Sequence, residues 1–148
     1  MNKLLTKALV ALMFFALATG TTTSAQLFEG SSIKARIPFG FYAGNTWLPA
    51  GKYTIRLPNT LAPDLLLIQN ANDPVEAFLI TDSTTRATAA RESSLDFDRL
   101  GNKYFLSDIW VERHKTGFRL EAPSLEKKLE KGAMKKEIQA VTVHRAKL

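Results

Sequence analysis

The chain has 148 residues, of which 45% are hydrophobic and 23% charged; it contains no cysteine and carries a formal net charge of +6. This composition is typical of one folded domain and excludes a long disordered chain, a disulfide-rich scaffold and a collagen-like fibre. The lack of cysteine also excludes thiol catalysis, a thiolate zinc site and a lipoprotein anchor, which needs a cysteine at its cleavage site.

The first 25 residues have the three-part pattern of a secretory signal peptide. Lys3 and Lys7 form a positive start, residues 8–18 are all apolar, and Ala25 ends a stretch of small residues. A membrane anchor is disfavoured, because an apolar helix of this length spans only ~16 Å of a ~30 Å hydrocarbon core. We therefore predict cleavage after Ala25 and export to the periplasm or out of the cell.

Removal of the signal peptide changes the charge of the chain. Lys and Arg number 20 and Asp and Glu 14, so the loss of Lys3 and Lys7 leaves 18 against 14, a net charge of +4. This excess is too small to indicate a nucleic-acid partner. We expect residues 26–31 to form a flexible mature N-terminus and residues 32–148 to form one domain.

The first part of that domain alternates apolar and polar residues, as half-buried strands do. Residues 33–39 place Ile, Ala, Ile and Phe on one face and Lys and Arg on the other, and residues 53–57 repeat the pattern. Between them, Gly44-Asn45 predicts a tight hairpin turn and Leu48-Pro49-Ala50-Gly51 a type I turn.

The middle of the chain predicts more strands. The apolar run 65–68 does not alternate, which indicates a strand covered on both sides, with residues 77–81 as its hairpin partner. Residues 82–93 are polar and predict a mobile loop with a possible helical turn. Strands at 95–98 and 104–111, joined by Leu100-Gly101-Asn102-Lys103, form the next hairpin.

One helix is expected near residues 124–131, started by Pro123-Ser124 and stopped by Gly132, and a last strand follows near 138–143. About eight short strands and one late helix predict an all-β, mainly antiparallel fold. We expect a small β-barrel or β-sandwich with one C-terminal helix.

Three motifs carry a resemblance to a known family. They are I-P-F-G-F at residues 37–41, L-P-A-G-K-Y-T-I at 48–55 and K-Y-F-L-S-D-I-W at 103–110. In these motifs the chain resembles a family of small uncharacterised secreted proteins of acidobacterial-type soil bacteria. The resemblance implies architecture and export, and it transfers no catalytic residue.

The chain lacks the common motifs of catalysis and cofactor binding. It has no G-x-S-x-G elbow, no glycine-rich phosphate loop and no calcium-binding loop, and its two histidines, His114 and His144, are far apart in sequence. We therefore expect no cofactor and no metal site.

Asp96 and Asp98 are the weak candidates for catalysis. Residues i and i+2 of a strand share a face, so the two carboxylates could divide acid and base roles if burial separated their pKa values. The favoured interpretation is a solvent-facing pair, because Leu95 and Phe97 alternate with them toward the core.

The aromatic residues flanking the early turns are candidates for ligand binding. Tyr42, Trp47 and Tyr53 could form an exposed aromatic platform, or they could belong to the core of a small β domain. The mixed-sign C-terminal segment 126–147 has a basic excess that could contact an anionic envelope surface weakly.

Three classes of function follow. We predict an exported, non-enzymatic β domain that binds a protein or envelope partner. The first alternative is a carrier of a small apolar ligand in a barrel cavity, and the second is a hydrolase-type enzyme that uses Asp96 and Asp98.

Overall fold

The computed structural model describes residues 31–56, 64–74, 76–132 and 134–147. The predicted signal peptide, most of the predicted flexible N-terminus and Leu57, the expected end of a strand, lie outside these residues. No helix in the described ranges has the length and hydrophobicity needed to cross a membrane.

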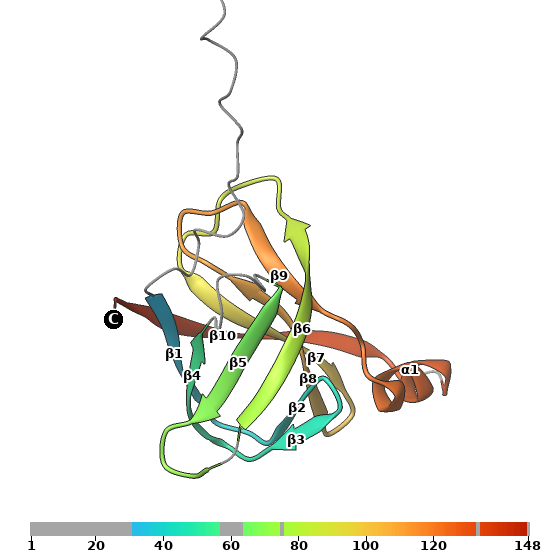
Figure 1. The fold of residues 1–148 in the computed structure, drawn as a ribbon. Helices are drawn as coiled ribbons and strands as arrows, with labels where there is room; N and C mark the ends of the chain where they lie inside the picture. Colours follow the sequence, from blue (N-terminus) through green and yellow to red (C-terminus); the bar gives the residue numbers. More distant parts are fainter. Residues whose placement is uncertain (1–30, 57–63, 75, 133, 148) are drawn as a thin grey trace, which may run out of the picture.

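The described residues form ten strands and one helix, which confirms the all-β prediction with a single late helix (Figure 1). The elements are β1 (Ser31–Ile37), β2 (Phe41–Ala43), β3 (Thr46–Leu48), β4 (Gly51–Arg56), β5 (Leu65–Asn70), β6 (Glu76–Thr85), β7 (Ser93–Leu100), β8 (Lys103–Trp110), β9 (Thr116–Leu120), α1 (Ser124–Lys131) and β10 (Lys136–Lys147).

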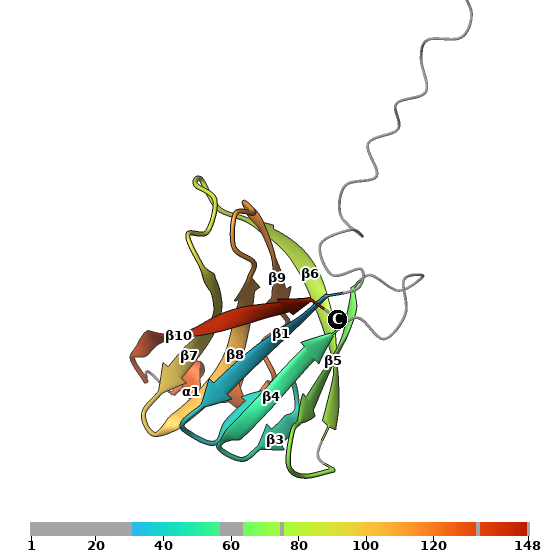
Figure 2. The same ribbon diagram turned by 90° about the vertical axis from the view of Figure 1, so that its left-hand side faces the viewer.

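The strands form two faces that share their longest members, β6 and β10. The first half of β6 pairs with β5 and its second half with β9. Likewise, β10 pairs first with β7 and then with β1 (Figure 2). Long strands that change partners in this way join packed sheets at their corners. The ten described strands therefore form one mixed sheet that folds around a single core.

The strand order is β3-β2-β8-β7-β10-β1-β4-β5-β6-β9, and β8 also pairs with β9. These pairings are antiparallel except for β2 with β8, which meet in parallel at Tyr42 and Phe105. The short β2–β3 hairpin is therefore an addition to the side of β8.

The alternation of apolar and polar residues in the sequence correctly predicts which side chains of β1 are buried and which are exposed. In β1, Ile33, Ala35 and Ile37 are buried while Lys34 and Arg36 are exposed. Turns form at Gly44-Asn45 and at Gly101-Asn102 as predicted, and both Gly44 (φ 56°) and Gly101 (φ 62°) adopt the left-handed conformation that glycine tolerates best.

The prediction of a mobile loop at 82–93 was wrong in part. β6 continues to Thr85, where it pairs with β9, a strand that the sequence analysis did not predict. The rest of the segment is held by backbone hydrogen bonds: Arg86 N donates to Lys115 O (2.8 Å) and Ala90 N to His114 O (3.0 Å). These long-range contacts have no local sequence signal.

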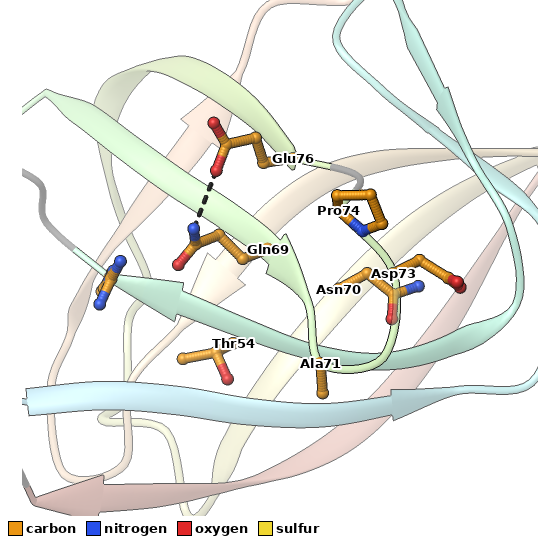
Figure 3. Close-up of a pocket in the computed structure, with 8 residues that line it drawn as sticks. Thr54, Gln69, Asn70, Ala71, Asp73, Pro74 and Glu76 are labelled. Carbon is orange, nitrogen blue, oxygen red and sulfur yellow. Dashed lines mark hydrogen bonds between the residues drawn. The ribbon is translucent and has the colours of Figure 1, made fainter.

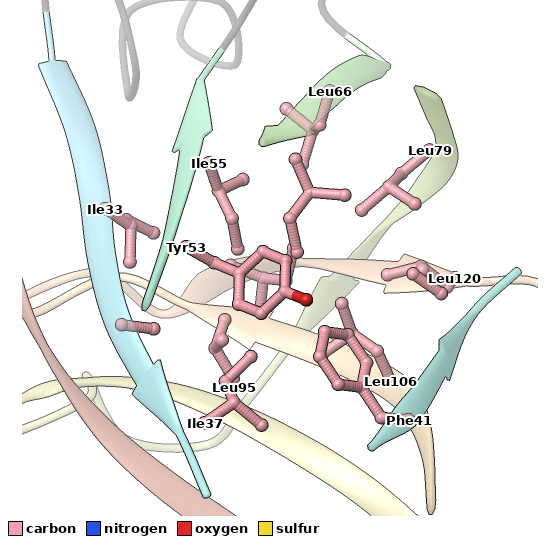
Figure 4. Close-up of a cluster of buried hydrophobic side chains, with 14 of the residues drawn as sticks. Ile33, Ile37, Phe41, Tyr53, Ile55, Leu66, Leu79, Leu95, Leu106 and Leu120 are labelled. Atoms are coloured by element: carbon pink, nitrogen blue, oxygen red, sulfur yellow. The ribbon is translucent and has the colours of Figure 1, made fainter. Parts of the chain in front are cut away.

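Large apolar side chains fill the space between the faces (Figure 4). Phe41 makes edge-to-face contacts with Tyr53 and Phe97, each at 5.3 Å between ring centroids. Tyr53 is 1% exposed, and its hydroxyl donates a 2.6 Å hydrogen bond to the carbonyl of Pro49. The one polar atom of this ring therefore has a partner, as a buried hydroxyl requires.

Candidate functional site

Asp96 and Asp98 lie on the outer face of β7, on the side predicted from the alternation. Leu95 and Phe97 point inward and are both 0% exposed. The side chains of Asp96 and Asp98 are nevertheless only 16% and 15% exposed, because different neighbours cover each of them. The two carboxylates therefore belong to separate clusters.

Asp96 is the acceptor in a cluster with an arginine and a tryptophan. Its Oδ2 accepts from Arg86 Nη2 (2.9 Å) and Trp110 Nε1 (3.0 Å), and Ser94 Oγ donates to its Oδ1 (3.3 Å). The Arg86 guanidinium also lies 3.6 Å from the centre of the Trp110 ring. Burial raises the pKa of Asp96, against the charge of Arg86 and the hydrogen bonds from Ser94 and Trp110. The Asp96 carboxylate is therefore already paired with a cation of the same chain, Arg86.

Asp98 belongs to a cluster of three carboxylates around Lys136. Lys136 Nζ lies 2.8 Å from Asp98 Oδ2 and 3.1 Å from Glu126 Oε1, and it also contacts Glu130. Burial raises the pKa of Glu126 to about 7, against the hydrogen bond and charge of Lys136 and with a further rise from Asp98. Although burial lowers the pKa of Lys136, its three carboxylate partners raise it overall. The cluster ties α1 to the outer face of β7 and β10.

These contacts limit what the Asp pair can do. A general acid and a general base must each be free to exchange a proton with the same bound substrate. Here Asp96 is paired with Arg86. Asp98 shares the single charge of Lys136 with two glutamates, so each aspartate is held in an ion-pair cluster of its own. Within the described ranges, no group of three or more His, Asp or Glu side chains is arranged to hold a metal ion.

The predicted aromatic platform needs a correction. Tyr42 and Trp47 are direct cross-strand partners in the β2–β3 hairpin, and Trp47 is 56% exposed. Tyr42 stacks on Phe105 at 5.2 Å between ring centroids. Tyr53, however, points into the core, because it shares the inward parity of Ile55 on β4. Of the three predicted residues, only Tyr42 and Trp47 of the β2–β3 hairpin remain candidates for an exposed platform.

Two of the described C-terminal lysines are paired with acidic residues. Lys127 pairs with Glu121 at 2.7 Å, and Lys136 is held by the carboxylates described above. Lys128 and Lys131 of α1 are exposed. Side chains 144–147 lie outside the described part of the structure.

Exposed cations also lie on β1 and β4, outside the C-terminal segment. Lys34 and Arg36 of β1 and Lys52 and Arg56 of β4 are exposed on the outer side of two paired strands. We call these four residues the cationic face. None of them is in an ion pair within the described part of the chain.

The register of β1 and β4 places like charges together. Arg36 is directly opposite Lys52, and Lys34 is opposite Thr54. Like charges directly opposite one another destabilise a strand pair. The sequence signal was present as alternating cations in each strand, but only the pairing register brings the two sets side by side.

Two open hollows lie on this side of the molecule. One, of about 320 Å³, is lined by Lys34, Arg36, Lys52 and Thr54 together with Ala35, Tyr53 and Ala71. The other, of about 350 Å³, lies over β4 and β5 and reaches the turn before β6 (Figure 3). Its lining residues are Thr54, Arg56, Gln69, Asn70, Ala71, Asp73, Pro74 and Glu76.

Comparisons with family models, curated proteins and solved structures found no match to this chain. The resemblance to small secreted soil-bacterial proteins therefore stays a prediction.

Proposed function

We propose that this chain is an exported, non-enzymatic β domain that associates with the cell envelope by binding an anionic surface through its cationic face. The observation that carries the proposal is the opposed pair Arg36 and Lys52, flanked by Lys34 and Arg56. Export follows from the signal-peptide pattern of residues 1–25.

The physical reason is that an external anion relieves the repulsion on this face. A like-charge pair directly opposite across two strands is unfavourable by roughly 0.2–1 kcal/mol. Each basic side chain near an anionic lipid surface contributes about 1 kcal/mol of binding, so four give up to ~4 kcal/mol. Weak, multivalent and salt-sensitive attachment is the expected behaviour.

The two alternatives have less support. For an enzyme, Asp96 and Asp98 are held by different cations in separate clusters. For a carrier of an apolar ligand, the aromatic residues at the centre of the described core pack against one another. Of the two hollows on the outer face, the one over β4 and β5 is lined mainly by polar and charged groups. The lining of the one over β1 and β4 is mainly apolar, but this hollow is open and is bordered by Lys34, Arg36 and Lys52.

The test is binding of the exported, processed chain to lipid vesicles. We expect sedimentation with vesicles containing phosphatidylglycerol, loss of binding as salt rises, and little binding to neutral vesicles. Arg36→Gln/Lys52→Gln should weaken binding at least tenfold. The matched control, Lys128→Gln/Lys131→Gln, removes the same charge from α1 and should change binding less than twofold. Equal losses in both variants would contradict a specific role for the cationic face.

A further inference from the structure

The two hollows beside the cationic face adjoin. Thr54 and Ala71 line both of them, so the surface is hollowed from β1 across β4 to the β5–β6 turn. Neighbouring strands lie ~4.8 Å apart, so a groove crossing from β1 to β6 spans roughly 14 Å. A single phosphate or carboxylate cannot fill that length, so an occupant that uses all of it must be extended.

The groove changes chemically along its length. Its β1–β4 end carries Lys34, Arg36 and Lys52 of the cationic face and has no acidic residue in its lining. Its other end carries the fourth cation, Arg56, but also amide and carboxylate groups, from Gln69, Asn70, Asp73 and Glu76. An occupant is therefore expected to place ionised acidic groups at the first end and neutral hydroxyl groups at the second.

The polar side chains of the second end are held in position before any ligand arrives. Gln69 Nε2 donates to Glu76 Oε2 at 2.8 Å (Figure 3), and Asn70 Oδ1 accepts from Asn72 N at 2.9 Å. Asn70 also lies close over Gly51, where an added Cβ would come within 3.0 Å of its amide nitrogen. Because these side chains are already ordered, less conformational entropy is lost on binding.

On these grounds we propose that the groove binds a segment of an acidic polysaccharide, with carboxylates over Lys34, Arg36 and Lys52 and sugar hydroxyls at Thr54, Gln69 and Glu76. This inference rests on the proposed function, because it names the anionic ligand of the same face. A flat lipid surface can contact the exposed cations, but it cannot reach the floor of the groove or the amide groups of Gln69 and Asn70.

The experiment compares three probes on the processed chain: uronate oligosaccharides, neutral dextran oligosaccharides of the same length, and phosphatidylglycerol vesicles. We expect the uronate chain to bind at least tenfold more tightly than dextran at moderate salt. Thr54→Trp, which fills the groove without changing charge, should weaken uronate binding at least tenfold and leave vesicle binding within twofold. Arg36→Gln/Lys52→Gln should weaken both.

A second variant guards against loss of folding in Thr54→Trp. Gln69→Ala removes an exposed amide from the floor and should weaken uronate binding about threefold to tenfold, with an unchanged thermal unfolding midpoint. The Lys128→Gln/Lys131→Gln control should bind every probe as the unaltered chain does.

The outcomes separate the two proposals. Vesicle binding with no preference for uronate over dextran, or uronate binding unchanged in folded Thr54→Trp and Gln69→Ala, overturns the polysaccharide site and leaves the anionic-surface function standing. Failure to bind either anionic probe overturns both.

Discussion

Replacing Glu126 by Gln tests how the buried carboxylate cluster affects folding. Glu126 has a side chain that is 3% exposed, and its Oε1 lies 3.1 Å from Lys136 Nζ. Burial raises its pKa from 4.5 to about 7, although Lys136 opposes the rise; the neighbouring Asp98 adds to it. The folded chain therefore holds a proton at this site at pH values where the unfolded chain releases it.

The sign of the effect follows from the direction of this shift. An acid whose pKa is higher in the folded state stabilises that state when protonated, so the contribution is present below pH 4.5 and is lost as the pH rises to about 7. At about 1.4 kcal/mol per pKa unit, the rise from 4.5 to about 7 sets an upper limit of ~3 kcal/mol. Since Lys136 and Asp98 respond to the same proton, we expect a loss of at least about 1 kcal/mol.

The measurement is the free energy of unfolding in urea at several pH values between 4.5 and 8. The unaltered chain should lose stability relative to Glu126→Gln across this range, because Gln does not ionise. Glu121→Gln is the matched control: Glu121 is exposed, and Lys127 lowers its pKa by a hydrogen bond and by its charge. Its stabilising effect is present above pH 4.5 and lost only at lower pH, so this variant should follow the unaltered chain. Parallel curves for the unaltered chain and Glu126→Gln would refute the reasoning.

Three further predictions concern packing and exposure. Gly117→Ala should lower the free energy of unfolding by about 1–3 kcal/mol, because its Cβ would lie 2.6 Å from Trp110 Cε3; an unchanged urea midpoint would contradict this. Tyr53→Phe removes the donor to the Pro49 carbonyl and should lower the unfolding free energy by about 1–2 kcal/mol in the same assay, and a neutral result would show that the hydrogen bond contributes nothing. In acrylamide quenching, Trp110→Phe leaves the 56% exposed Trp47, which should be quenched strongly; Trp47→Phe leaves the 4% exposed Trp110, which should be protected. Similar quenching constants for the two variants would contradict the difference in exposure between Trp47 and Trp110.

Part of this fold follows from local patterns. Alternation placed Lys34 outside and Ile33 inside, and it placed Asp96 outside and Leu95 inside, because successive side chains of a strand point to opposite faces. The turn at Gly44-Asn45 was also predicted locally, and Gly44 takes a positive φ there because glycine tolerates that conformation. The sequence was therefore sufficient for the class of fold and for the orientation of its clearest strands.

Other features depend on partners far away in the chain. The strand β9 forms because the second half of β6 pairs with it, and the sequence analysis had assigned that part of β6 to a loop. Tyr53 was a candidate for an exposed platform, but its position in the register of β4 places it in the core. The pairing of β6 with β9 has no signal within a short window of sequence, whereas the burial of Tyr53 agrees with the local alternation of residues 53–57.

The candidate sites show the same division. The sequence by itself determined which residues carry charge: alternating cations in two strands, acids in a third and a mixed-sign helix. Only the tertiary structure decided that Arg36 stands opposite Lys52, and that Glu126 is buried beside Asp98 and Lys136. The physical reason is that charge is a property of one residue, whereas the spacing and solvation of charges are set by strand register and burial, which involve the whole chain.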